Sequence, residues 1–159
     1  DWLYSLKAEK SLQGASFIAG AMVLSQYQPL DMLMYYDARP CPMNGMFATD
    51  YVCDKLKGYY PLYWYGMMYD ALGEVPSEGT GDNVYALCGK MADGKALAII
   101  TYYTDCATDE KKEILANFGH GGKFEIYLVD KTHSGELLEK TDEPKVTLSP
   151  CSFALIREV

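Results

Sequence analysis

The sequence predicts an α+β chain, with a helical first half followed by an antiparallel β second half. Residues 1–74 show helical periodicity and long aromatic runs, whereas residues 75–159 show short alternating segments between turns of Gly, Asp, Asn and Pro. The stretch 74–83 is the one segment with the composition of a linker. We therefore expect one domain over residues 1–74 and a second over residues 75–159.

The first element is expected to be a helix from Ser5 to Tyr27. Its apolar residues cover nearly the whole circumference, which predicts a helix buried on most of its surface. The small residues between Gly14 and Ala21 would let another element approach closely. Pro29 follows shortly and ends the helix.

The run Leu30–Asp37 predicts a strand inside a parallel sheet, because it is apolar on both faces and ends in polar residues. An irregular loop over residues 38–47 follows. A second helix is then expected from Leu56 or Lys57 to Leu72, closed by Gly73. The first half thus reads as an α-β-α slice of a larger parallel layer, whose other strands lie outside this chain or in a second copy of it.

The second half predicts an antiparallel β-sandwich, because short strands recur at regular spacing. The Asp-Gly pair in Met91–Lys95 predicts a hairpin turn, since glycine takes the positive φ that such a turn requires. Gly119–Gly122 predicts another turn. The strands are expected at Val84–Lys90, Ala96–Tyr103, Glu113–Asn117, Phe124–Asp130, Glu136–Glu139, Val146–Leu148 and Phe153–Arg157.

The composition excludes several classes of partner. The formal net charge is -8, with only 14 Lys and Arg residues and no basic run, and such a surface repels nucleic acid and anionic lipid. No apolar run reaches the ~20 residues of a membrane-spanning helix. We therefore expect no nucleic-acid partner and no membrane partner.

Cysteine usage and the first residues predict the compartment. The five cysteines are odd in number and lack Cys-x-x-Cys spacing, which favours reduced thiols in a cytoplasm. Free buried thiols in a secreted bacterial enzyme are the alternative. The chain opens at Asp1 with no signal peptide and no initiator Met, so we expect a cytoplasmic piece of a longer protein.

No metal and no cofactor are expected. His120 and His133 are the only histidines, and neither stands at a spacing typical of a zinc site. The sequence also contains no phosphate-binding glycine loop and no Gly-x-Ser-x-Gly elbow.

Four segments in order resemble the end of a known group of enzymes. Met34–Arg39, Asn44–Phe47 and Lys57–Tyr60, with the ending Leu148–Ile156, are similar to the end of clan A glycoside hydrolases of the β-xylosidase and α-L-iduronidase type family. In that family the eighth barrel strand is followed by an Asn-Gly loop, a Tyr-rich final helix and a C-terminal β domain. The resemblance implies that the first half is the end of a (β/α)8 barrel, with Leu30–Asp37 as its eighth strand.

The resemblance also implies where the chemistry lies. Enzymes of the family use two glutamates, and both positions would precede Asp1. Independently, a retaining glycosidase needs two carboxyl groups about 5–5.5 Å apart, and these lie at the C-terminal ends of barrel strands. In residues 1–74 only Asp37 occupies such a position. We therefore expect no catalytic residue in this chain and no activity from the chain alone.

Three residues are candidates for contact with sugar. Tyr36 and Asp37 would face the sugar pocket of an intact barrel, and Asn44 could bind sugar hydroxyls. Alternatively, Asp37 caps a turn before Pro40, and Asn44 is a plain turn residue. The aromatic residues between Tyr59 and Tyr69 are expected to fill the seam between the two halves rather than to stack on sugars.

Two functions from different classes follow. The first is the C-terminal portion of a β-xylosidase-like, retaining glycoside hydrolase, which meets carbohydrate only through the parent barrel. The second is a non-catalytic carbohydrate-binding or structural β module. The partner would be the remainder of the parent enzyme, or a second copy that pairs through Leu30–Asp37.

Overall fold

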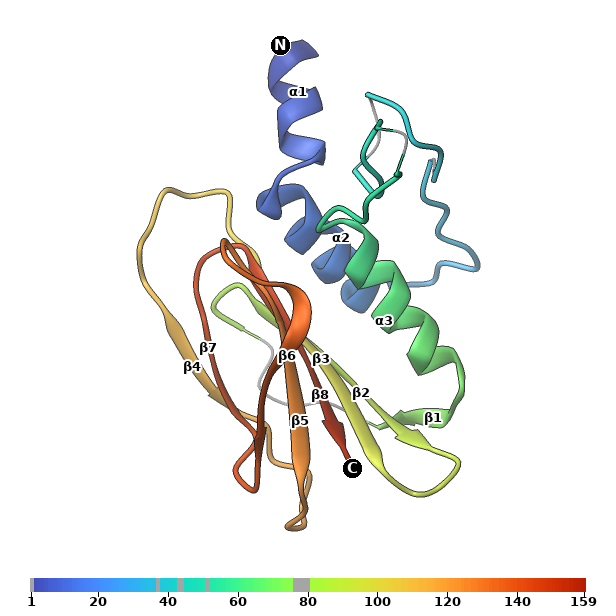
Figure 1. Ribbon diagram of the computed structural model, residues 1–159. Helices are drawn as coiled ribbons and strands as arrows, with labels where there is room; N and C mark the ends of the chain where they lie inside the picture. The colour runs from blue at the N-terminus through green and yellow to red at the C-terminus, as the bar shows by residue number, and fades with distance from the viewer. Residues whose placement is uncertain (1, 37, 43–44, 51, 76–80) are drawn as a thin grey trace.

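The computed structural model describes residues 2–36, 38–42, 45–50, 52–75 and 81–159. In this part of the chain, three helices lie beside an antiparallel sheet, so the fold is mixed α+β (Figure 1). The helices are α1 (Trp2–Glu9), α2 (Leu12–Ser25) and α3 (Tyr59–Tyr69). The strands are β1 (Ala71–Val75), β2 (Val84–Met91), β3 (Ala96–Tyr102), β4 (Lys112–Leu115), β5 (Phe124–Val129), β6 (Ser134–Thr141), β7 (Lys145–Leu148) and β8 (Ser152–Glu158).

Six strands form one sheet in the order β1-β2-β3-β8-β5-β6, and β4 pairs with β7 in a second, two-stranded sheet. Side chains alternate between two cores along β8, because successive residues of a strand point to opposite faces. Phe153 and Leu155 pack against Trp64 of α3. Ala154 and Ile156 pack against β7 on the other face. The large sheet is therefore covered by α2 and α3 on one side and by the two-stranded sheet of β4 and β7 on the other.

Helix α2 lies close to the sheet because its inner face carries small side chains. Ala15, Ser16, Ala19 and Gly20 are all buried. The hydroxyl of Thr101 on β3 donates to the Ser16 carbonyl at 3.4 Å, so the helix backbone itself contacts the sheet. The sequence expectation that small residues permit a close approach is confirmed.

The single helix expected from Ser5 to Tyr27 is instead two helices, with a break at Lys10 and Ser11. The Ser11 hydroxyl donates to the Ala8 carbonyl at 2.6 Å and accepts from the Gly14 N–H at 3.2 Å. The Ser11 side chain therefore provides a hydrogen-bond donor for a carbonyl at the end of α1 and an acceptor for an N–H at the start of α2. Both hydrogen bonds stabilise the break.

The strand predicted at Leu30–Asp37 is wrong for the described residues 30–36, which form neither strand nor helix. Met32 and Met34 are exposed, at 71% and 79%. A strand requires a neighbour for its backbone N–H and C=O groups, and this segment pairs with none among the described residues. Asp37 lies outside the described residues.

The second helix is shorter than expected. It ends at Tyr69 rather than Leu72, and Asp70 rather than Gly73 closes it. The predicted end was wrong because residues 71–75 pair with β2 as strand β1, with Gly73 opposite Lys90. Pro61 lies in the first turn of α3, where its missing N–H costs no helical hydrogen bond.

The seven strands predicted in the second half are all present, within two residues of the expected bounds. The Met91–Lys95 hairpin turn is confirmed, since Gly94 has φ +87° and its N–H donates to the Met91 carbonyl at 2.9 Å. The division into domains at residues 74 and 75 stays a prediction. In the described part of the chain, no helix has the length and apolar character to cross a bilayer.

Trp64 anchors α3 on the sheet. It is 2% exposed, and its ring meets Phe153 edge-on at 5.5 Å. We predict that Trp64→Ala lowers the free energy of unfolding by about 3–5 kcal/mol, because a large cavity opens beneath α3. Urea unfolding measures the change. Tyr69→Ala, at a position 91% exposed, is the matched control and should stay within about 0.5 kcal/mol of the parent.

Candidate functional site

Of the three predicted sugar-contact residues, the structure describes only Tyr36. Tyr36 is 85% exposed in the irregular segment after α2. Asp37 and Asn44 lie outside the described residues. Their role in sugar binding therefore stays a prediction.

Gly45 packs tightly on the break between α1 and α2. The Gly45 N–H donates to the Tyr35 hydroxyl at 3.2 Å. A side chain at Gly45 would collide with the Glu9 carbonyl oxygen, and one at Gly58 would meet the Gly45 carbonyl. Glycine is needed at both positions because three backbone segments meet there without room for a Cβ. Gly45 and Gly58 thus have a packing role.

Lys57 joins the start of α3 to the turn between β5 and β6. Its ammonium donates to the carbonyls of Asp130 and His133, the latter at 2.7 Å, and to the Ser134 hydroxyl at 3.3 Å. Nearby, the ring of Tyr60 lies where a side chain at position 135 would project. We call the hydrogen bonds from Lys57 to Asp130, His133 and Ser134 the lysine clamp. They link residues more than 70 positions apart in the sequence.

The turn that receives the clamp is ordered by one carboxylate. Asp130 Oδ1 accepts from the N–H groups of Thr132 and His133, both at 2.7 Å, and from His133 Nδ1 at 3.0 Å. Burial tends to raise the pKa of Asp130, but these hydrogen bonds outweigh it and lower the pKa overall. The carbonyls that hold Lys57 are therefore fixed in place by an ionised side chain.

The aromatic residues of α3 divide into two sets. Trp64, Tyr60 and Tyr65 pack in the core beneath the helix, as predicted for this run of rings, whereas Tyr69 is 91% exposed. Tyr59 and Tyr63 stack on each other at 5.5 Å, and Tyr63 is half exposed.

A charge network crosses the sheet near the end of β8. Glu125 on β5 lies opposite Arg157 on β8 and Lys140 on β6. Its carboxylate accepts from Arg157 Nη2 at 2.6 Å, Lys140 Nζ at 2.7 Å and the Tyr127 hydroxyl at 2.8 Å. The hydrogen bonds from Lys140, Tyr127 and Arg157 lower the pKa of Glu125 to about 2.

This carboxylate is unsuited to acid–base chemistry near neutral pH. A general acid needs a raised pKa, and Glu125 has the opposite. Its side chain is only 7% exposed, and both oxygens are engaged by donors. The network therefore acts as structure. Sequence reasoning missed it because its members are brought together by strand register, which no local pattern reveals.

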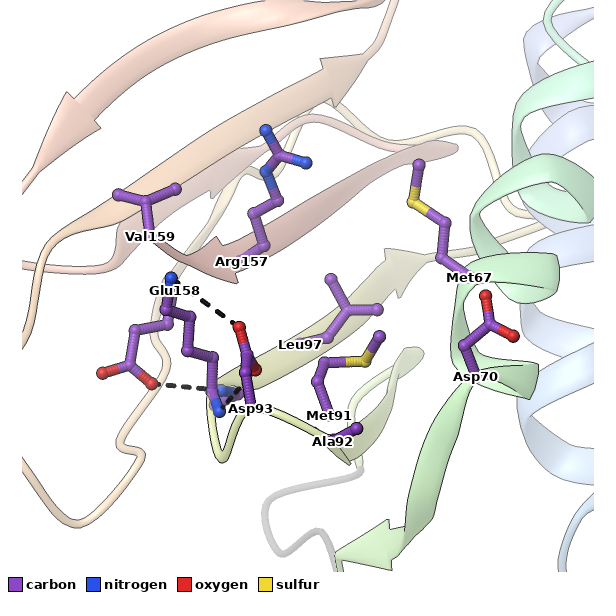
Figure 2. Close-up of a pocket in the computed structure, with 11 residues that line it drawn as sticks. Met67, Asp70, Met91, Ala92, Asp93, Leu97, Arg157, Glu158 and Val159 are labelled. Atoms are coloured by element: carbon purple, nitrogen blue, oxygen red, sulfur yellow. Dashed lines mark hydrogen bonds and ion pairs between the residues drawn. The ribbon is translucent and has the colours of Figure 1, made fainter.

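A hollow of about 670 Å³ lies beside this network, at the end of α3 (Figure 2). Figure 2 shows Met67 of α3 and Asp70, the residue that follows α3, on one side and Arg157 of β8 on the other. Leu97 and Met91 add apolar surface between them. In the described part of the chain, no group of three or more His, Cys, Asp or Glu side chains is placed to hold a metal ion.

The lysine clamp should stabilise the β5–β6 turn. We predict that Lys57→Met lowers the free energy of unfolding by about 1–2 kcal/mol, because the carbonyls of Asp130 and His133 lose a charged donor. Urea unfolding and hydrogen exchange of the Asp130 N–H, which donates to the His133 carbonyl at 3.1 Å, measure the effect. Lys123→Met, at an exposed position, is the control. Unchanged exchange at Asp130 would show that the clamp does not order the turn.

The low pKa of Glu125 predicts a pH dependence of stability. The unfolded chain binds the proton near pH 4.5 and the folded chain only near pH 2, so this stabilisation is complete above pH 4.5 and is lost as the pH falls toward 2. Glu125→Gln should cost about 1 kcal/mol at pH 7, since the cationic partners reach solvent. The variant should also lose less free energy of unfolding than the parent as the pH falls from 4.5 to 2. Urea unfolding at a series of pH values measures the difference.

The control for that experiment is Glu113→Gln. Glu113 pairs with Lys145 at 2.9 Å, but both side chains are exposed. An equal effect from both variants would contradict the role given to the buried network.

Comparison with known proteins gives a likeness of fold. No protein-family model matches the chain, and no curated protein matches it in sequence. Among solved structures, the chain is similar to a family 30 endoxylanase from Clostridium papyrosolvens, with TM-score 0.69, 13% identity, and coverage of 94% of this chain and 39% of that one.

Two further solved structures show the same likeness of fold. A glucosidase from Croceicoccus marinus has TM-score 0.67 and 18% identity, covering 92% of this chain and 41% of that one. A glycoside hydrolase family 30 subfamily 8 xylanase from Clostridium acetobutylicum has TM-score 0.65 and 10% identity, covering 94% and 40%. The chain therefore spans about two fifths of the length of these enzymes. Over nearly all of its own length, it has the fold of one part of a glycoside hydrolase.

Proposed function

We propose that this chain is the C-terminal, non-catalytic portion of a retaining glycoside hydrolase that acts on β-xyloside-like substrates. The observation that carries the proposal is the fold likeness: 92–94% of this chain matches only 39–41% of three sugar-cleaving enzymes. In this proposal the helical half is the end of a (β/α)8 barrel, and the two sheets form the β-sandwich that follows it.

The helical half supports the proposal through its surface and not through a strand. The apolar run at residues 30–36 is not paired as a strand, so the lone barrel strand no longer argues for the proposal. Instead, the surface of the helical half supports it. Trp2, Met34 and Tyr36 are more than 60% exposed. Exposed apolar side chains gathered on one half of a molecule mark a surface that another part covers.

The partner proposed for this surface is the remainder of the parent enzyme. Upstream strands of the barrel would give residues 30–36 the strand pairing that the described part of the chain does not supply. A second copy of the chain is the alternative partner. In either arrangement Tyr36, Asp37 and Asn44 would lie near the C-terminal ends of the barrel strands, where sugar binds in such folds.

The proposal predicts that the chain alone does not hydrolyse an aryl β-xyloside, since two carboxyl groups about 5–5.5 Å apart are needed. A longer polypeptide that includes the coding sequence upstream of Asp1 should do so. Chromogenic assays on both proteins measure the difference. Turnover by the chain alone after stringent purification would overturn the proposal, and so would an upstream sequence with no barrel and no glutamate.

Calorimetry with xylo-oligosaccharides separates the proposal from an independent carbohydrate-binding module. A portion that binds sugar only through the complete barrel should release no heat with the chain alone. Saturable binding by the chain alone would favour the module.

A further inference from the structure

Cys106 and Cys151 both form a hydrogen bond with Thr104, although the two cysteines are far apart in the sequence. Tyr102 and Ser152 form the last pair of the β3–β8 ladder, so the chain after β3 and the chain before β8 leave the sheet at the same end. Cys151 immediately precedes that pair, and Cys106 follows it by four positions.

A tight turn directs the thiol of Cys151. The Ser152 N–H donates to the Ser149 carbonyl at 3.1 Å, which closes a four-residue turn with Pro150 and Cys151 at its centre. Cys151 has φ +62°, a value that favours glycine at this turn position. Its Sγ donates to the Thr104 carbonyl at 3.1 Å. The side chain is therefore held against the loop that follows β3.

A second turn brings Cys106 back to Thr104. The Cys106 N–H donates to Thr104 Oγ1 at 3.1 Å, a side-chain turn of the kind threonine forms in loops. Thr104 is buried, whereas Cys106 is exposed. The Cys106 Sγ points toward Asp105 Oδ1 at 3.6 Å, and rotation about χ1 of an exposed side chain is a low-cost motion. Residues 104–111 form no helix or strand, so the loop can adjust.

We propose that Cys106 and Cys151 are a redox-sensitive pair, which a small disulfide reagent of the glutathione class converts to an intramolecular disulfide. The thiolate of Cys106, the more exposed of the two, attacks one sulfur of the oxidised reagent and releases one reduced thiol. The thiolate of Cys151 then attacks the Cys106 sulfur, and a second reduced thiol leaves. Two protons and two electrons pass from the cysteines to the reagent.

The disulfide would lock the β3–β4 loop to the turn before β8. That turn leads directly into β8, so the cross-link would hold together the two chain segments that leave the sheet at this end of the β3–β8 ladder. Closing the loop between the two cysteines also restricts the unfolded chain, which raises the melting temperature.

The test equilibrates the full chain with oxidised glutathione, then blocks the remaining thiols with a maleimide and maps them by peptide mass spectrometry. The expected result is a loss of two hydrogen atoms in mass, protection of Cys106 and Cys151 together, and continued labelling of the exposed Cys53. The melting temperature should rise, and reduction should reverse every change.

Three variants make the outcome decisive. Cys106→Ser should leave Cys151 able to form only a mixed disulfide with glutathione. Cys151→Gly should leave Cys106 able to form only a mixed disulfide with glutathione. Glycine suits the positive φ of that turn, so this variant keeps its fold. Cys53→Ser should still form the intramolecular disulfide. Labelling of both cysteines at the rate of Cys53, or an intramolecular disulfide that survives in either single variant, would overturn the proposal.

Discussion

The insertion of strand β8 between β3 and β5 is the constraint on which the rest of the fold depends. Residues 152–156 of β8 are buried, and their side chains supply both cores in alternation. Helices on one face and the small sheet on the other can therefore pack fully only after β8 has entered. Since β3 and β8 are far apart in the sequence, a large loop must close first, and such contacts form slowly.

The helical half is attached to the sheet by two different devices. Small residues on α2 bring the helix backbone to within hydrogen-bond reach of Thr101, while Lys57 ties the start of α3 to the β5–β6 turn. Both devices act on the inner side of the helices. The outer side keeps its apolar residues exposed, which is the physical reason for proposing that a further part of an enzyme covers it.

The sequence predicts local patterns well and long-range pairing poorly. Alternation and the Asp-Gly turn located the strands of the second half, because both signals are contained within a few residues. The run at residues 30–36 has the composition of a buried strand, yet strand formation depends on neighbours that composition cannot supply. Gly73 shows the converse: it looks like a helix cap, but pairing with Lys90 makes it part of a strand. No local pattern reveals the contacts of Lys57 and Glu125, because their partners come from distant turns and strands. The candidate residues Asp37 and Asn44 lie outside the described residues, and only Tyr36 is placed.

The row formed by Lys140, Glu125 and Arg157 has a consequence for errors in strand pairing. In the observed register Glu125 shares a face with its cationic partners, and Phe124 faces the core under β7. A slip of β5 by one residue would turn Glu125 into that apolar core without a partner. The misaligned sheet would then carry a buried, unneutralised charge, whereas the correct sheet gains only a modest ion pair. The row therefore discriminates between alignments more strongly than it contributes to the strength of the correct one.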